Sequence, residues 1–189
     1  MMKKIIAVVG NAKPPVGSLN EQIAFEIGKA IVDNGYRLQC GGLNGVMLAA
    51  CKGAHASDNY KEGDVIGILP SFDVSTANEY VDIAIPTGLD VYRNVIVASA
   101  SAVIAVGGGS GTLCEIANAW ALKKLVIGMT KADGWGAKLA GLRLDDRIRY
   151  PEYPEDQIYP AETAEEAMAY INKYIDGYDN VHEGITPNL

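Results

Sequence analysis

Short apolar runs that alternate with helix-forming segments constrain the fold of this 189-residue chain more than any other feature. Most of the runs are continuous stretches of Val, Ile, Leu and Ala, without alternation of apolar and polar residues. This pattern is typical of strands in a parallel sheet that is covered on both faces. We therefore predict strands at residues 4–9, 36–40, 65–69, 102–106 and 125–129, with a shorter strand near 80–85.

Helical patterns separate these strands. The clearest helix opens with S-L-N-E, in which Ser18 and Glu21 form a capping box, and its apolar stripe is Ile23, Ile27 and Ile31. A second capping box, T-A-E-E, opens the last helical segment. Further helices are predicted at residues 45–57, 91–100, 112–123 and 163–176.

Alternation of strands and helices indicates βαβ units. The sequence therefore predicts an α/β fold with a doubly wound, mainly parallel, Rossmann-like sheet. We expect a single domain over residues 1–176, followed by a C-terminal tail over 177–189. Residues 131–160 are read as a long connection, a kind of segment that often serves function or contacts between subunits.

Charge and composition exclude several classes of function. The net charge is −7, the wrong sign for general nucleic-acid binding, so no nucleic-acid partner is expected. Neither the three cysteines nor the two histidines have the spacing of a metal site, so no metal is predicted. No apolar run reaches the roughly 20 residues that span a bilayer, and the apolar start reads as a strand. We expect a cytoplasmic protein without a membrane partner.

Three glycine-bearing loops follow predicted strands: VVGNAKPPVGS, CGGLNGVM and GGGSGT. Ligands of open α/β sheets bind at the carboxyl ends of strands, so the three loops can converge on one crevice. Glycine lets backbone N–H groups approach an anion closely, and a helix start adds partial positive charge. The loops match neither GxGxxG nor a P-loop. The candidate ligand-binding and phosphate-binding residues are Gly10, Gly41, Gly42, Gly45, Arg93, Gly108, Gly109, Ser110, Gly111, Thr112 and Glu115.

The stretch AVIAVGGGSGTLCEIANAW, residues 102–120, leaves two readings open. T-L-C-E is a capping box in one reading, with Thr112 as the N-cap and Glu115 bonded back to it. In the other, Glu115 points at a ligand held by the glycines. Arg93 is either a solvated surface residue or a bidentate phosphate ligand. Lys13, in the first loop, is either solvated or a second cation near the anion.

The motif GGGSGTLCE resembles the PGGxGTxxE signature of the Lonely Guy family, the cytokinin-activating phosphoribohydrolases. CGGLNGVMLAACKGA resembles that family's other glycine loop and helix, and GDVIGILP resembles the strand between. The chain is still more similar to a branch related to molybdenum cofactor carrier proteins, and more distantly to Smf/DprA proteins. The resemblance covers roughly residues 4–130.

The resemblance implies a Rossmann-like homodimer or homotetramer in which residues 108–112 bind a phosphate. Glu115 falls on the catalytic carboxylate of the hydrolases, and Arg93 lies one position from their catalytic arginine. Two departures weaken the hydrolase assignment: the leading Pro is Gly107, and the usual Arg-Lys pair reads Arg93-Asn94.

Two functions follow. The first is a binding or carrier protein for a phosphorylated nucleotide-like or pterin ligand, molybdenum cofactor carrier-like and with no required cofactor. The candidate bound molecules are a nucleoside monophosphate and the molybdenum cofactor. The second is a phosphoribohydrolase that cleaves the N-glycosidic bond of a nucleoside 5'-monophosphate, with Glu115 and Arg93 as catalytic residues. Because the chain departs from the hydrolase signature at Gly107 and at Arg93-Asn94, the carrier function ranks ahead of the phosphoribohydrolase.

Overall fold

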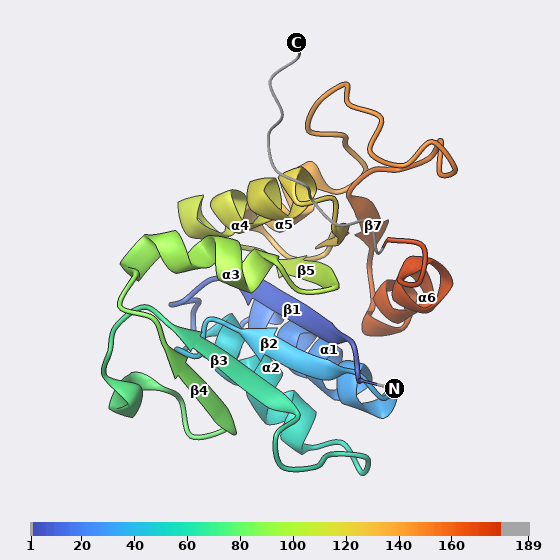
Figure 1. Cartoon of the computed structure of the whole chain (residues 1–189). Coiled ribbons are helices and arrows are strands. Elements are labelled where there is room, and N and C mark those ends of the chain that lie inside the picture. Colours follow the sequence, from blue (N-terminus) through green and yellow to red (C-terminus); the bar gives the residue numbers. More distant parts are fainter. Residues whose placement is uncertain (1, 179–189) are drawn as a thin grey trace.

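The computed structural model describes residues 2–178, and its strands and helices alternate along the chain (Figure 1). The strands are β1 (Ile5–Gly10), β2 (Arg37–Cys40), β3 (Val65–Leu69), β4 (Ile83–Pro86), β5 (Ala102–Val106), β6 (Leu125–Met129) and β7 (Tyr159–Ala161). The helices are α1 (Leu19–Asp33), α2 (Val46–His55), α3 (Asn94–Ala98), α4 (Ser110–Ala121), α5 (Gly134–Leu139) and α6 (Ala164–Tyr174). Two 3₁₀ turns, η1 (Val74–Thr76) and η2 (Asp90–Arg93), flank β4.

The seven strands form one sheet in the order β4-β3-β2-β1-β5-β6-β7, and every neighbouring pair is parallel. The chain first winds outward from β1 to β4 and then returns to the other side of β1 at β5. The predicted doubly wound α/β fold of one domain is therefore confirmed. The reversal of strand order between β1 and β5 creates the position where ligands of such sheets bind.

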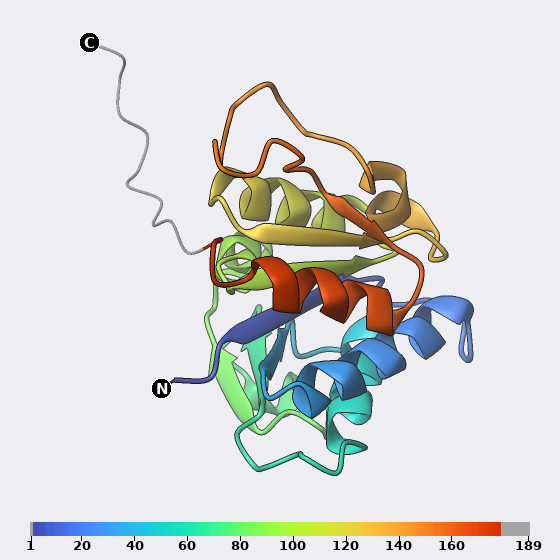
Figure 2. The same ribbon diagram turned by 90° about the vertical axis from the view of Figure 1, so that its right-hand side faces the viewer.

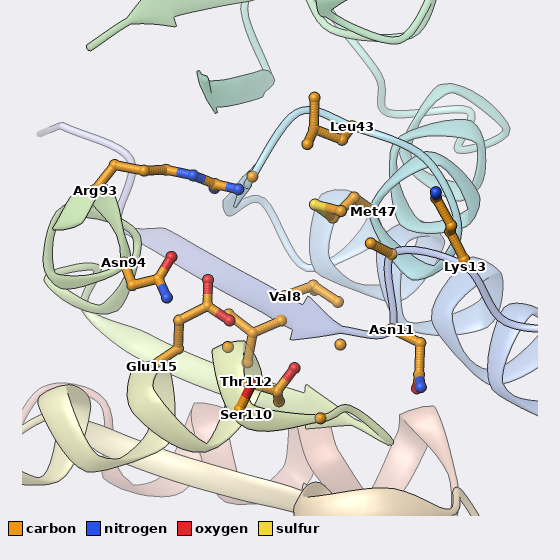
Figure 3. Close-up of a pocket in the computed structure, with 16 residues that line it drawn as sticks. Val8, Asn11, Lys13, Leu43, Met47, Arg93, Asn94, Ser110, Thr112 and Glu115 are labelled. Atoms are coloured by element: carbon orange, nitrogen blue, oxygen red, sulfur yellow. The ribbon is translucent and has the colours of Figure 1, made fainter. Parts of the chain in front are cut away.

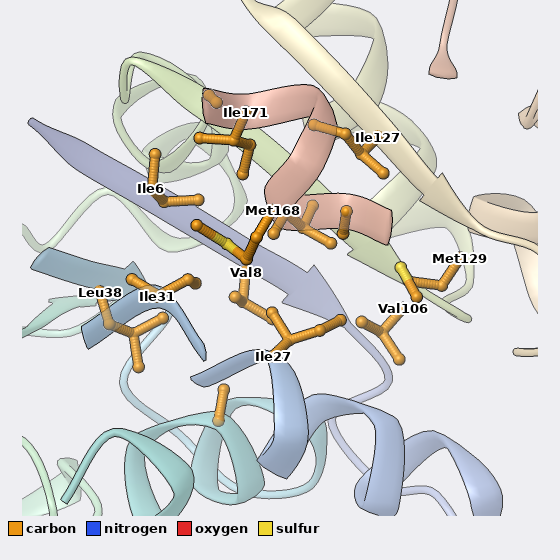
Figure 4. Close-up of a cluster of buried hydrophobic side chains, with 14 of the residues drawn as sticks. Ile6, Val8, Ile27, Ile31, Leu38, Val106, Ile127, Met129, Met168 and Ile171 are labelled. Carbon is orange, nitrogen blue, oxygen red and sulfur yellow. The ribbon is translucent and has the colours of Figure 1, made fainter. Parts of the chain in front are cut away.

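Helices cover the two faces of the sheet with separate apolar clusters. On one face α1, α2 and α6 pack over side chains that include Ile6, Val8 and Leu38 (Figures 2 and 4). On the other face α3 and α4 pack over Ala7, Val9 and neighbours. Successive residues of β1 thus point to opposite faces and are buried on both. This explains why the central strands read as unbroken apolar runs.

Both capping boxes form, although the Glu side chain bonds one residue further back than predicted. The Ser18 hydroxyl accepts from the Glu21 N–H at 3.4 Å, and the Glu21 carboxylate accepts from the Gly17 N–H at 2.7 Å. At the start of α6, Thr163 accepts from the Glu166 N–H at 3.2 Å. The reciprocal bonds fix the start of both helices, as the sequence predicted.

The predicted element bounds need three corrections. The helix predicted at 91–100 is a 3₁₀ turn followed by the five-residue α3, and the helix predicted at 112–123 begins at Ser110. The predicted connection 131–160 contains α5 and β7. α5 is not predicted from the sequence because Gly134 and Gly136 are poor helix formers. Glycine is nevertheless required at position 136, because a Cβ there would lie 2.7 Å from the Ala105 carbonyl oxygen. β7 contains Pro160, which an edge strand tolerates because one side of it has no partner.

The predicted tail begins within the folded part of the chain. Tyr178 is buried in the cluster beneath α6, and its hydroxyl donates to the Asp156 carboxylate at 2.7 Å. Residues 179–189 of the tail lie outside the described residues. Within residues 2–178, no helix has the length and apolar character needed to span a bilayer.

Candidate functional site

The three glycine loops meet at the carboxyl ends of β1, β2 and β5, where they enclose a cavity of about 320 Å³ (Figure 3). This places the cavity at the reversal of strand order. Eight of the residues predicted for the site line it: Gly10, Gly41, Arg93, Gly109, Ser110, Gly111, Thr112 and Glu115. The remaining wall comes from Val8, Val9, Asn11, Ala12, Lys13, Leu43, Met47 and Asn94.

Gly42, Gly45 and Gly108 were predicted with this set but do not line the cavity. Gly42 and Gly45 have φ values of 74° and 67°. A Cβ on Gly45 would lie 2.4 Å from the Asn11 carbonyl oxygen, and one on Gly108 would overlap the Thr112 side chain. These glycines let neighbouring loops pack closely against one another, so they support the loops that line the cavity without lining it themselves.

Asn11 ties the three loops together. Its side-chain oxygen accepts hydrogen bonds from the Gly108 N–H at 2.7 Å and from the Asn20 side chain at 3.0 Å. Its carbonyl oxygen accepts from the Val46 N–H, at the start of α2, at 2.9 Å. Asn20 also donates to Asp133 at 2.6 Å. None of the three residues Asn11, Asn20 and Asp133 is predicted from the sequence, although Asn11 lies directly after a buried strand, where ligand-binding loops of such sheets begin.

The start of α4 presents free donors to the cavity. Gly109 is the N-cap, and no side chain caps the helix. Within the described residues, the N–H groups of Ser110, Gly111 and Thr112 donate no hydrogen bond, and the first one used for the helix is that of Leu113. A Cβ on Gly109 would meet nothing within 4 Å. The helix therefore directs unpaired N–H groups and its positive dipole end into open space, an arrangement suited to an anion.

Arg93 brings a positive charge to the same cavity. It ends η2, is only 8% exposed, and its guanidinium passes so close to Gly41 that a Cβ there would lie 2.3 Å from Nη1. Nε and Nη1 are buried and have no hydrogen-bond partner. Burial lowers the pKa of Arg93, and the Glu115 charge partly opposes that effect. A buried cation without hydrogen-bond partners is energetically costly in the ligand-free protein.

Glu115 extends from α4 towards the same opening (Figure 3). It is 8% exposed, and burial raises its pKa to about 7, although the nearby Arg93 charge acts in the opposite direction. Within residues 2–178 no salt bridge joins the two side chains. The carboxyl group therefore changes its charge near neutral pH inside the cavity, as an acid or base catalyst or a pH-sensitive ligand contact would.

The capping-box reading of T-L-C-E is wrong. Because α4 begins at Ser110, Thr112 lies inside its first turn and cannot be the N-cap.

Lys13 and Asn94 also line the cavity. Among the described residues, no group of three or more His, Cys, Asp and Glu side chains is placed to hold a metal ion.

The charge of Glu115 gives a pH-dependent prediction. The pKa of Glu115 is about 7 in the folded chain and about 4.5 when unfolded, so between these values only the unfolded chain loses the proton. The proton on Glu115 therefore favours the folded state below pH 4.5, and this contribution to the free energy of unfolding is lost as the pH rises to 7. Relative to Glu115→Gln, the unfolding free energy of the wild type should fall by about 3 kcal/mol over that window. Urea denaturation at several pH values measures this difference, and a constant difference would contradict the buried, titrating carboxyl group.

Comparison with known proteins places the chain in a defined family. The model of the SLOG cluster4 family matches residues 3–168. An uncharacterized protein of Archaeoglobus fulgidus is 44% identical over 97 residues, which make up 51% of this chain and 61% of that relative. The match therefore spans less than two-thirds of the relative's length.

Solved structures share the complete fold. The X-ray structure of TM1055 is similar with a TM-score of 0.76 and 31% identity, covering 90% of this chain and 99% of the other. The molybdenum cofactor binding protein of Rippkaea orientalis has a TM-score of 0.72 and 33% identity, covering 93% and 99%. The molybdenum cofactor carrier protein of Chlamydomonas reinhardtii has a TM-score of 0.72 and 30% identity, with the same coverage.

Proposed function

The chain belongs to the SLOG cluster4 family, and from this membership and the cavity we propose that it binds and carries a phosphorylated nucleotide-like or pterin ligand. The observation that carries the proposal is that the unpartnered Arg93 guanidinium and the free N–H groups of α4 line the same cavity. The similar proteins that bind or carry the molybdenum cofactor support a small-molecule ligand. As the family resemblance implies, we also propose a homodimer or homotetramer.

The phosphate would lie at the start of α4. There it would accept from the N–H groups of Ser110, Gly111 and Thr112 and from the guanidinium of Arg93, which can bind two phosphate oxygens. Leu43 and Met47 form an apolar wall on the opposite side of the cavity (Figure 3). A flat base or pterin ring would pack against that wall. These residues suit the phosphate and ring of the molybdenum cofactor as cargo, and equally those of a nucleoside monophosphate.

Whatever copurifies with the protein gives the direct test. Native mass spectrometry should show a ligand whose mass fits a phosphorylated pterin or a nucleoside monophosphate, released on denaturation. Titration calorimetry of the ligand-free protein should then show binding of the phosphorylated compound and much weaker binding of its dephosphorylated form. Equal affinities for the two forms would contradict the phosphate cradle.

A phosphoribohydrolase is the second candidate, and the position of Glu115 favours it. A buried carboxyl group with a pKa of about 7 in the cavity could assist cleavage of the bond between a base and its ribose. Water would add to the sugar carbon as the base leaves. Release of free base and ribose 5-phosphate from a nucleoside monophosphate, abolished in Glu115→Gln, would replace the carrier assignment. A carrier should show no release, and Glu115→Gln should change its affinity only.

Gly111→Ala separates binding from folding. The new methyl group would enter open space, with the nearest atom, Nδ2 of Asn94, 4.0 Å away. Alanine should therefore stabilise α4 by about 0.5–1 kcal/mol, because it is the better helix former. Gly111 nevertheless lines the cavity, so the methyl group would take up space there and the affinity for the phosphorylated ligand should fall at least tenfold.

The matched control is Asn118→Ala, which also improves the helix propensity of α4 but lies outside the cavity. Its ligand affinity should equal that of the wild type. Thermal melts and calorimetry on the three proteins provide the comparison. Unchanged affinity in Gly111→Ala would place the ligand elsewhere.

A further inference from the structure

Two buried cysteines lie in contact beside the second glycine loop. Cys40 ends β2, Cys51 lies in α2, and their Sγ atoms are 3.5 Å apart. Both side chains are completely buried and both thiols are free. The third cysteine of the chain, Cys114, lies on α4 and is exposed. The two buried sulfur atoms need to approach by only about 1.5 Å to reach the separation found in a disulfide bond.

The surroundings of the two sulfur atoms differ. Sγ of Cys40 accepts a hydrogen bond from the Gly42 N–H at 3.3 Å. The hydrogen bond from Cys51, this N–H group and the charge of Arg93 lower the pKa of Cys40, although burial and the Glu115 charge act in the opposite direction. The pKa of Cys51 is raised, first by its hydrogen bond to Cys40 and then by burial. Cys40 is therefore the better nucleophile and Cys51 the thiol that keeps its proton, which is how a redox-active pair divides the two roles.

Both cysteines adjoin residues that line the ligand cavity. Cys40 is followed directly by Gly41. Cys51 lies one helical turn after Met47, on the same side of α2. A Cβ on Gly41 would lie 2.3 Å from Nη1 of Arg93 and 2.7 Å from Sδ of Met47, so these groups are tightly packed (Figure 3). A movement of either cysteine therefore displaces part of the cavity wall.

Asn78 links the same pair to the second glycine loop. Its side-chain nitrogen donates to the Leu43 carbonyl oxygen at 2.8 Å and to Sγ of Cys51 at 3.7 Å. Its backbone N–H donates to the Gly42 carbonyl oxygen at 2.9 Å. The loop that follows Cys40 is thus held by a residue that also contacts Cys51, and Leu43 of that loop belongs to the cavity wall.

We propose that Cys40 and Cys51 are a redox-active pair that hydrogen peroxide converts to a disulfide, and that this bond reshapes the ligand cavity. The Cys40 thiolate attacks one peroxide oxygen, the O–O bond breaks, and the departing hydroxide takes up the proton released by Cys40 to become water. The sulfur of Cys51 then attacks the sulfenic acid on Cys40. The S–S bond forms, the S–O bond breaks, and hydroxide leaves with the Cys51 proton as a second water. The two thiols thus lose two electrons and two protons, which the peroxide gains.

The position of the pair explains both its access and its effect. Hydrogen peroxide is little larger than water, and the cavity brings it to Gly41 and Met47, which adjoin the two cysteines. Formation of the bond draws the end of β2 towards α2, so Gly41 moves and the Arg93 guanidinium packed against it is displaced. The disulfide does not depend on the proposed function, whereas its effect on phosphate binding rests on that proposal.

Peptide mass spectrometry of the ligand-free Cys114→Ser protein tests the bond, because this variant lacks the exposed thiol and keeps the buried pair. The folded protein is treated with excess hydrogen peroxide and then alkylated in denaturant. The peptides that contain Cys40 and Cys51 should be joined with the loss of two hydrogens, and dithiothreitol should separate them. The matched control is Cys51→Ala in the same background, in which Cys40 should gain oxygen because no second thiol is present to displace it.

Nuclear magnetic resonance on the reduced and oxidised Cys114→Ser protein tests the link to the cavity. The amide signals of Gly41 and Leu43 should shift on oxidation without any ligand. Titration with inorganic phosphate, followed at Gly111, should give an affinity that is weaker by about fivefold or more after oxidation, as is typical of coupled sites.

Two free buried thiols, after a treatment that fully oxidises Cys114 of the wild type, would overturn the redox-active pair. Unchanged signals of Gly41 and Leu43 in the oxidised protein, or equal phosphate affinities of the two forms, would overturn the link to the cavity. If the signals shift but phosphate binds to neither form, the redox-active pair and its link are supported and the phosphate cradle is contradicted.

Discussion

Arg93→Met is expected to lower the affinity for a phosphorylated ligand by tenfold to a hundredfold or more, while the affinity for the dephosphorylated compound changes little. The buried guanidinium has no partner on its Nε and Nη1 atoms and faces the cavity, so its hydrogen bonds are available to a phosphate. A hydrogen bond to a charged group contributes about 1.5–3 kcal/mol, and each 1.4 kcal/mol is a factor of ten in affinity. Calorimetric titration of the wild type and the variant with both compounds measures the two ratios.

The same substitution should leave the ligand-free protein as stable as the wild type, or more stable. Methionine fills part of the space of the arginine stem and removes a cation that is buried without hydrogen bonds. Arg93→Lys is the matched control for charge, since it keeps the cation but loses the planar, bidentate geometry, and it should fall between the other two proteins in affinity. A large loss of stability in Arg93→Met, or equal losses of affinity for both compounds, would make Arg93 a structural residue.

Asp156→Ala is expected to lower the free energy of unfolding by about 3–5 kcal/mol. Asp156 and Arg149 are 3% and 5% exposed, and Arg149 donates to the two carboxylate oxygens at 2.8 and 2.6 Å. Nη1 of Arg149 donates further to the carbonyl oxygens of Trp120 and Lys124, both at 3.1 Å. Removing the carboxylate would leave a buried cation without its counter-ion at the point where the 140–158 connection packs on the end of α4.

Glu162→Ala provides the control for this pair. Lys131 and Glu162 are 3.0 Å apart but both are exposed, so the loss of their interaction should change the unfolding free energy by less than about 1 kcal/mol. Urea denaturation of the two variants and the wild type gives both values. A destabilisation of Asp156→Ala no larger than that of Glu162→Ala would show that solvent, not burial, governs the Arg149 pair.

The sequence alone was sufficient for the order and type of most elements. The unbroken apolar runs correctly predicted β1, β3, β5 and β6, because strands covered on both faces need apolar side chains at nearly every position. The capping boxes at Ser18 and Thr163 were readable because their hydrogen bonds join residues only three or four positions apart. The convergence of the glycine loops followed from the doubly wound topology itself.

Only the tertiary structure decided where the individual residues of the cavity lie and which groups they contact. Whether Thr112 caps α4 depended on where the helix begins, and Gly109 takes that position. The Arg93 guanidinium can lie where it does only because Gly41 has no side chain. The first and third glycine loops are joined by the hydrogen bond from the Gly108 N–H to the Asn11 side chain. These contacts join segments that are tens of residues apart, so no local spacing records them. A side chain's burial and partners are properties of the packed chain, and in this protein they show that Arg93 is a buried arginine that lines the cavity and not a solvated surface residue.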